Sequence, residues 1–161
     1  TALLASRSAT DGDRERAAAL FESVGAVVWL PREDLFHAVT ALSASGPAFV
    51  YAFAEALADG GVASGLTRAL ALQLAAHTIA GAGRTLVATS EHPAALKDKV
   101  ASPAGTTIHG LAALERAAVR GGVIDAVRAA AARSRELAWQ PLPRKKRTAR
   151  RVHATPKKAR R

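Results

Sequence analysis

Apolar residues cover more than one face of the helices that the sequence predicts between residues 33 and 138. In residues 48–58, Phe49, Phe53 and Leu57 recur every four positions among alanines. A helix that is apolar on several faces must be buried on several sides, and a chain of 161 residues holds few helices to cover it. We therefore expect a mainly α fold whose helices interlock with those of a second copy in an obligate dimer. An ordinary monomeric helical bundle is the alternative.

Glycine, proline and capping residues mark the expected helix limits. Helices are predicted over residues 33–42 and 48–58, from Thr67 to about residue 89, from Pro93, around the series Ile108, Leu111 and Leu114, and over residues 123–138. Breaks are expected at residues 43–47, Gly60-Gly61 and Gly121-Gly122. Gly81 and Gly83 fall inside a predicted helix, where each costs about 1 kcal/mol relative to Ala. Their presence indicates that another backbone passes close by.

The first 30 residues have a different pattern. A helix is expected over residues 11–24, with Asp11 as its N-cap and Gly25 after its end. Residues 26–30 are predicted to form a short buried strand, and residues 2–5 the end of another. Strand, helix and strand form the closing part of a βαβ domain. No Gly-x-Gly-x-x-Gly turn, the sequence that binds a dinucleotide, follows a strand in this chain.

The basic charge is confined to the end of the chain. The net charge is +10, and residues 140–161 hold ten Lys or Arg and no acidic residue. We expect residues 139–161 to be a basic disordered tail, because they lack apolar periodicity. Such a tail is either a solvated extension or a nonspecific contact for polyanions such as nucleic acid or anionic lipid.

Composition also disfavours several classes of site and location. The chain has no Cys, which excludes disulfides and thiolate metal sites. No apolar run is predicted to be long enough for a membrane span, and no signal peptide is evident, so we expect a cytoplasmic protein. The chain contains no Met either, so we expect a piece of a longer protein, a processed product or a wrongly assigned gene start. The histidines lack zinc-ligand spacing, so we expect no metal and read them as packing or surface residues; they are His37, His77, His92, His109 and His153.

A loop between two short predicted helices carries the polar residues best suited to bind a ligand. It is Ser-Pro-Ala-Gly-Thr-Thr at residues 102–107. Gly105 lets a ligand approach the backbone closely, and the N-terminus of the following helix offers free N–H groups to an anion. On these residues alone, Thr106 or Thr107 is as readily a helix cap, and Ser102-Pro103 an ordinary turn.

Five stretches of the chain form a pattern typical of one enzyme family. They are Thr-Ala-Leu at residues 1–3, the strand with Trp29, residues 40–51, residues 55–62 and, the longest, residues 91–115 from Glu-His-Pro to Ala-Ala-Leu-Glu. Together they resemble pyrroline-5-carboxylate reductase, the last enzyme of proline synthesis. The resemblance implies an N-terminal Rossmann domain that binds NADP or NAD and a C-terminal helical domain that makes an intertwined dimer, with larger rings of dimers.

The same resemblance implies the domain organisation of this chain. Residues 1–30 are then a remnant of the Rossmann domain, residues 31–138 are the dimerisation and substrate domain, and residues 139–161 are the tail. Most of the cofactor domain is missing, so we expect that this chain alone does not bind NADP or NAD and that its cofactor-binding residues are unknown.

The resemblance also implies a reaction and a set of site residues. The reaction moves a hydride from NAD(P)H to the ring C=N carbon of 1-pyrroline-5-carboxylate and gives L-proline. By analogy, Thr107 is the catalytic residue that orients the ring nitrogen, and Ser102 with the loop amides holds the substrate carboxylate. Glu91 is a further candidate near the nitrogen, or else a solvated residue before a helix. The implied substrate-binding set is Ser102, Ala104, Gly105, Thr106, Thr107 and Glu91.

The chain departs from the family at two positions, because the family commonly has Gly where Ala104 and Ala44 stand. If position 104 requires a positive φ, Ala costs on the order of 1 kcal/mol there and turns an amide away from the substrate.

Three functions remain open from the sequence. The chain is the substrate-binding and dimerisation part of a reductase, inactive alone. Alternatively it is a non-catalytic dimerisation module that pairs with itself or with a complete reductase, or a basic-tailed binder of polyanions.

Overall fold

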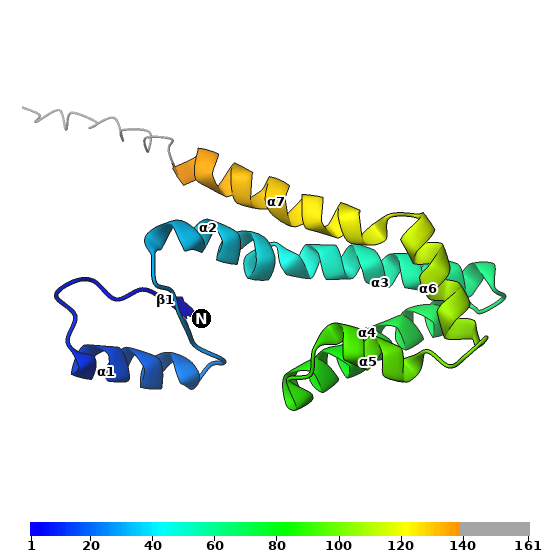
Figure 1. Ribbon diagram of the computed structural model, residues 1–161, viewed down its shortest axis with the longest axis horizontal. Coiled ribbons are helices and arrows are strands. Elements are labelled where there is room, and N and C mark those ends of the chain that lie inside the picture. The colour runs from blue at the N-terminus through cyan, green and yellow to red at the C-terminus, as the bar shows by residue number, and fades with distance from the viewer. Residues whose placement is uncertain (139–161) are drawn as a thin grey trace, which may run out of the picture.

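The structure, a computed structural model, describes residues 1–138, which form an open and elongated set of helices with one small sheet (Figure 1). The elements are, in order, β1 (Ala2–Leu3), α1 (Asp11–Glu22), β2 (Val28–Trp29), η1 (Glu33–Leu35), α2 (Phe36–Val39), η2 (Thr40–Ala44), α3 (Gly46–Ala63), α4 (Arg68–Thr89), α5 (Pro93–Val100), α6 (Thr106–Arg116) and α7 (Val119–Ala138). The expected mainly α fold is confirmed. The tail predicted at residues 139–161 lies outside the described residues.

The N-terminal unit is a strand, a helix and a strand, as expected. Strands β1 and β2 are parallel, with Ala2 opposite Val28 and Leu3 opposite Trp29. Helix α1 connects them, and the Arg14 guanidinium carbon lies 5.8 Å from the centre of the Trp29 ring, within reach of a cation–π interaction. The prediction that β2 is buried is wrong, because Val28 and Trp29 are 53% and 40% exposed. Two short strands and one helix leave much of this small sheet uncovered.

Helix α1 is capped by Thr10 rather than by Asp11, which corrects the sequence-based assignment. The Thr10 hydroxyl accepts a hydrogen bond from the Asp13 backbone N–H at 3.2 Å, and the Asp13 carboxylate accepts one from the Thr10 N–H at 2.9 Å. This reciprocal pair is a capping box. Hydrogen bonds from Thr10, and then from Arg16, hold the pKa of Asp13 below its ordinary value.

The longest feature is a nearly continuous helical rod from Glu33 to Ala63, with α7 packed along its first part (Figure 1). The break expected at residues 43–47 is instead a π-helical turn, closed by a hydrogen bond from the Ser45 N–H to the Thr40 carbonyl at 2.9 Å. A hydrogen bond of 2.9 Å between His37 Nδ1 and Ser134 Oγ joins α2 to α7.

Two pairs of glycines lie inside helices, not at their ends, which corrects two predicted breaks. Gly60-Gly61 belong to α3, and a Cβ at Gly61 would lie 3.2 Å from the Ala71 Cβ, so this glycine lets α3 and α4 pack closely. The turn after α3 uses Gly65, whose φ is +101°. Gly121-Gly122 belong to α7, and the chain turns just before them at Ala118, with a φ of +52°.

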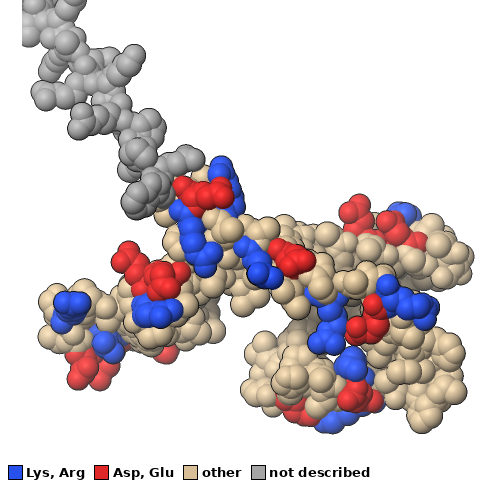
Figure 2. Space-filling model, turned by 45° about the horizontal axis from the view of Figure 1, so that its top comes forward, with Lys and Arg blue, Asp and Glu red and all other residues tan. Residues whose placement is uncertain are grey.

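The core of the described chain is small. Its buried apolar residues are all alanines: Ala41, Ala58, Ala71, Ala75 and Ala131. Large apolar side chains remain open, among them Tyr51 at 72% and Val87 at 84% exposure. Broad uncharged areas accordingly cover the helices, with mixed charges between them (Figure 2). Apolar surface of this extent marks an interaction face.

One stretch of the described residues, Glu33–Ala63, is long and apolar enough to cross a membrane by length and composition alone, because it contains an 18-residue window with a mean hydropathy of 1.2. The sequence analysis placed a break inside it and so did not regard it as a continuous apolar run. This finding is weak evidence for a span, since core helices of soluble proteins meet the same criteria.

Candidate functional site

The loop between α5 and α6 is a tight turn. The Gly105 N–H donates a hydrogen bond to the Ser102 carbonyl at 3.1 Å. Pro103 takes the second position of this turn, and Ala104 takes the third with a φ of +57°. Pro at the second position and a positive φ at the third are typical of a type II turn, which favours Gly at the third. Ala104 therefore has the positive φ at which an alanine is strained.

Replacing Ala104 by Gly is expected to raise the free energy of unfolding by about 1 kcal/mol, because Gly adopts a positive φ without the Cβ penalty. Thermal or urea unfolding measures the change. Ala132, exposed in the interior of helix α7, is the matched control. Ala132→Gly is expected to lower stability by about the same amount. If both variants changed the free energy of unfolding in the same direction, the turn assignment would be contradicted.

Gly105 matters for the space it leaves beside Ser102 and not for its backbone angles. Its φ of −77° and ψ of 174° are extended values that any residue adopts. A Cβ at this position, however, would overlap the Ser102 hydroxyl and would lie 3.3 Å from the Ser102 carbonyl oxygen. The glycine therefore leaves room for the Ser102 hydroxyl at the beginning of α6.

Helix α6 begins without a side-chain cap. Gly105 is its N-cap, so the alternative reading of Thr106 or Thr107 as caps is wrong. The first N–H groups of a helix have no partner within it, and the helix dipole favours an anion at this end. The turn and the first residues of α6 thus present backbone donors, the Ser102 hydroxyl and two threonine hydroxyls in one place.

The two threonines differ in exposure: Thr107 is half-buried and Thr106 is exposed. His109, read from the sequence as a packing or surface residue, contacts the same turn. Its Nδ1 lies 2.9 Å from the Gly105 carbonyl oxygen, so this ring helps to hold the N-cap residue. The signal that the sequence analysis missed is the spacing of four residues between His109 and the N-cap.

Glu91 is not joined to this loop by a hydrogen bond within residues 1–138. It precedes α5, and its carboxylate accepts a hydrogen bond from the Lys99 ammonium at 2.5 Å. Lys97 likewise pairs with Asp98 at 2.9 Å. Both of these α5 lysines therefore lie beside a carboxylate in an exposed ion pair, and the donors nearest to the loop are its own backbone N–H groups and hydroxyls.

The described part of the chain does not contain a set of residues that suits a metal ion or a dinucleotide. Residues 1–138 contain no group of three or more His, Asp or Glu arranged to hold a metal. The helix that follows a strand, α1, is where a dinucleotide phosphate would bind. Its first turn carries two carboxylates, Asp11 and Asp13, and Asp13 also closes the capping box with Thr10, so this helix start opposes a phosphate. The residues present therefore do not fit NADP or NAD.

Comparison with known proteins identifies the family. The family described as pyrroline-5-carboxylate reductase dimerisation matches residues 33–137. The pyrroline-5-carboxylate reductase of Synechocystis sp. is 50% identical over 137 residues, which are 85% of this chain and 51% of that protein.

Two solved structures agree with this result. A pyrroline-5-carboxylate reductase from Coxiella burnetii superposes with a TM-score of 0.81 at 34% identity, covering 84% of this chain and 50% of that one. The Plasmodium falciparum enzyme, solved with NADP bound, gives a TM-score of 0.72 at 32% identity over 84% of this chain and 52% of its own.

The chain thus spans about half the length of the relatives it matches. The match includes the Ser102–Thr107 turn, the start of α6 and most of the helices around them. On this evidence the chain belongs to the pyrroline-5-carboxylate reductase family.

Proposed function

We propose that this chain is the substrate-binding and dimerisation part of a pyrroline-5-carboxylate reductase. The whole enzyme reduces 1-pyrroline-5-carboxylate to L-proline with NAD(P)H and is an oxidoreductase of proline synthesis. The observation that carries the proposal is the start of α6, where the N-cap residue is Gly105 and no side chain caps the helix. The Ser102 hydroxyl lies next to this N-cap residue. Family membership supplies the reaction.

In this proposal the loop recognises two features of the substrate. Its carboxylate lies at the first turn of α6, beside the amides of Ala104 and Thr106, and accepts a hydrogen bond from Ser102, while the Gly105 amide stays bonded to the Ser102 carbonyl. The ring nitrogen lies beside Thr107, whose hydroxyl donates to it and orients it for protonation as the neighbouring carbon is reduced. Glu91 stays a weaker candidate, since Lys99 already holds its carboxylate.

The domain boundaries belong to the same proposal. Residues 1–30 are assigned to the cofactor domain, residues 31–138 to the helical domain and residues 139–161 to the tail. Two helical domains pair as a homodimer, as the exposed apolar faces of the rod and of α4 favour. Higher oligomers built from such dimers, and a cytoplasmic location, complete the assignment.

The isolated chain is expected to show no NADPH oxidation with pyrroline-5-carboxylate, because its residues do not fit the cofactor. A chimera in which residues 1–138 replace the matched half of the Synechocystis relative is expected to be active. Absorbance at the NADPH band measures both. Turnover by the isolated chain, or a folded but inactive chimera, would sink the proposal.

A non-catalytic dimerisation module is the second candidate, and the same exposed apolar faces favour it. The chimera separates the two, because a pure assembly module gives a folded dimer that lacks reductase activity. Such a module would also pair with a complete reductase.

The ten basic residues of the tail support a separate proposal of nonspecific polyanion binding. Deleting residues 140–161 is expected to abolish retention on heparin, and retention of the full chain is expected to fall steeply as salt rises. Equal retention of the two chains at low salt would contradict it.

A further inference from the structure

Both polar backbone groups of Gly105 are held by hydrogen bonds. Its N–H donates to the Ser102 carbonyl at 3.1 Å, which closes the turn. Its carbonyl oxygen lies 2.9 Å from Nδ1 of the His109 ring. Because a carbonyl oxygen only accepts, the ring must carry a proton on Nδ1 to make this bond. His109 therefore holds the carbonyl end of Gly105, as Ser102 holds its amide end.

The Gly105 carbonyl belongs to the same planar peptide group as the Thr106 N–H. In a trans peptide the two groups point in opposite directions, so a bond that fixes the carbonyl also fixes the direction of the N–H. The Thr106 N–H is the first of α6 and has no partner within the helix. It is also one of the two amides proposed to bind the substrate carboxylate. One rigid peptide group thus connects the His109 ring to the proposed ligand.

A proton donated to the Gly105 carbonyl also strengthens the Thr106 amide as a donor. Hydrogen bonds that are linked through a peptide group polarise one another, so the N–H becomes a better donor when the carbonyl of the same peptide accepts. Gly105 itself has no side chain with which to cap the helix. The ring of His109, one turn further along α6, supplies a side-chain contact to this N-cap residue instead.

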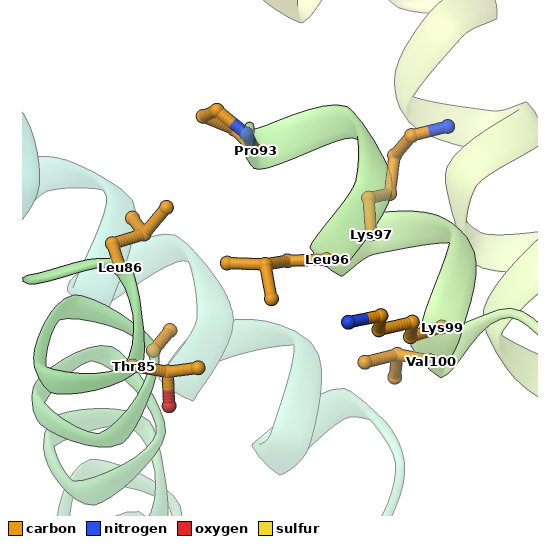
Figure 3. Close-up of a pocket in the computed structure, with 8 residues that line it drawn as sticks. Thr85, Leu86, Pro93, Leu96, Lys97, Lys99 and Val100 are labelled. Atoms are coloured by element: carbon orange, nitrogen blue, oxygen red, sulfur yellow. The ribbon is translucent and has the colours of Figure 1, made fainter. Parts of the chain in front are cut away.

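The two lysines near the end of the preceding helix have partners of their own. Lys97 pairs with Asp98, and Lys99 pairs with Glu91. Figure 3 shows the Lys99 side chain extending into the groove between α4 and α5. Among residues 1–138, the side chain that forms a hydrogen bond to the turn from outside it is that of His109. The groups that can adjust the donors of the turn are therefore found on α6 itself.

We propose that His109 is a positioning residue for the substrate. Its Nδ1–H fixes and polarises the Gly105–Thr106 peptide and so raises the affinity for the carboxylate of pyrroline-5-carboxylate. This inference rests on the proposed function of the turn. The ring acts on the carboxylate and not on the carbon that is reduced, so its loss is expected to change KM and to leave kcat almost unchanged.

The test compares His109→Phe with His109→Asn in the active chimera. Phe keeps a ring and has no donor, whereas the side-chain NH2 of Asn can take the place of Nδ1–H. His109→Phe is expected to raise the KM for pyrroline-5-carboxylate about fivefold, the effect of losing one hydrogen bond, with kcat within about twofold. His109→Asn is expected to restore KM to within about twofold of the unmodified chimera. His77→Phe, the same change at an exposed position of α4, is the matched control and is expected to leave KM unchanged.

A second measurement does not depend on activity and covers the case in which His109→Phe folds poorly. NMR spectra of the 15N-labelled full chain show which nitrogen of each histidine ring carries the proton. At a pH where imidazole is neutral, His109 is expected to carry its proton on Nδ1, because the Gly105 carbonyl selects that tautomer. The amide resonance of Thr106 is expected to move in His109→Phe and to return in His109→Asn.

The outcomes separate this inference from the proposed function. A folded but inactive chimera overturns the proposed function and the inference with it. An active chimera whose KM is unchanged by His109→Phe overturns the positioning role alone. Equal rises in KM for His109→Phe and His109→Asn, or a ring proton on Nε2, would show that the ring does not act as an Nδ1 donor, and either result overturns the inference. A fall in kcat as large as the rise in KM would overturn it as well.

Discussion

Thr107→Val in the active chimera is expected to lower kcat by about 100-fold while KM changes little. The reason is that the Thr107 hydroxyl is proposed to donate to the ring nitrogen, and loss of a group that assists proton transfer costs on the order of 10²-fold or more. Valine keeps the shape of the half-buried side chain, so the helix start should remain intact. Steady-state NADPH oxidation over a range of pyrroline-5-carboxylate concentrations separates the two constants.

Thr106→Val is the matched control for this prediction. Thr106 occupies the neighbouring position of the same helix turn, but its side chain is exposed. We expect its kcat to stay within about threefold of the unmodified chimera, since its proposed contact is through the backbone amide. Equal losses in the two variants would mean that the hydroxyl of Thr107 has no special role.

Gly105→Ala is expected to raise the KM for pyrroline-5-carboxylate by about tenfold. The new Cβ would overlap the Ser102 hydroxyl, so that hydroxyl must leave the position from which it is proposed to bind the carboxylate. Loss of one hydrogen bond to a charged group costs roughly 1.5 kcal/mol, which is about a tenfold change in binding. The backbone angles of Gly105 suit alanine, so the turn itself should survive.

A double-mutant cycle with Ser102→Ala tests this mechanism. Without the hydroxyl there is nothing for the Cβ to displace, so Gly105→Ala should add little to the effect of Ser102→Ala. Fully additive effects of the two changes would show that Gly105 acts through something other than Ser102.

Local chemistry made several features predictable from the sequence. The cap at Thr67 and the start at Pro93 were predicted correctly, because a helix start depends on residues within one turn of it. The position of the turn at residues 102–105 was predictable for the same reason, since Ser-Pro-Ala-Gly is a turn sequence in any context.

Features that depend on distant contacts were not predictable. Gly60-Gly61 suggested a helix end, but one of these glycines serves the approach of α4, which the sequence does not reveal. The sequence signal near the π-helical turn is Gly46-Pro47, which follows the turn and suggests only a break. The pairing of Glu91 with Lys99 spans eight residues and required the course of α5 to be known. Glu91 is consequently a weaker site residue in the structure than in the sequence.

The alanine core has a consequence for the life of this chain in a cell. Five small side chains contribute little transfer free energy, so in the proposed homodimer the contact between the two copies would supply much of the stability of the fold. For a dimer that unfolds as it separates, each tenfold dilution removes about 1.4 kcal/mol of apparent stability. A newly synthesised chain would then stay open to proteolysis until it meets a partner, and its rate of synthesis would help to determine how much of it survives.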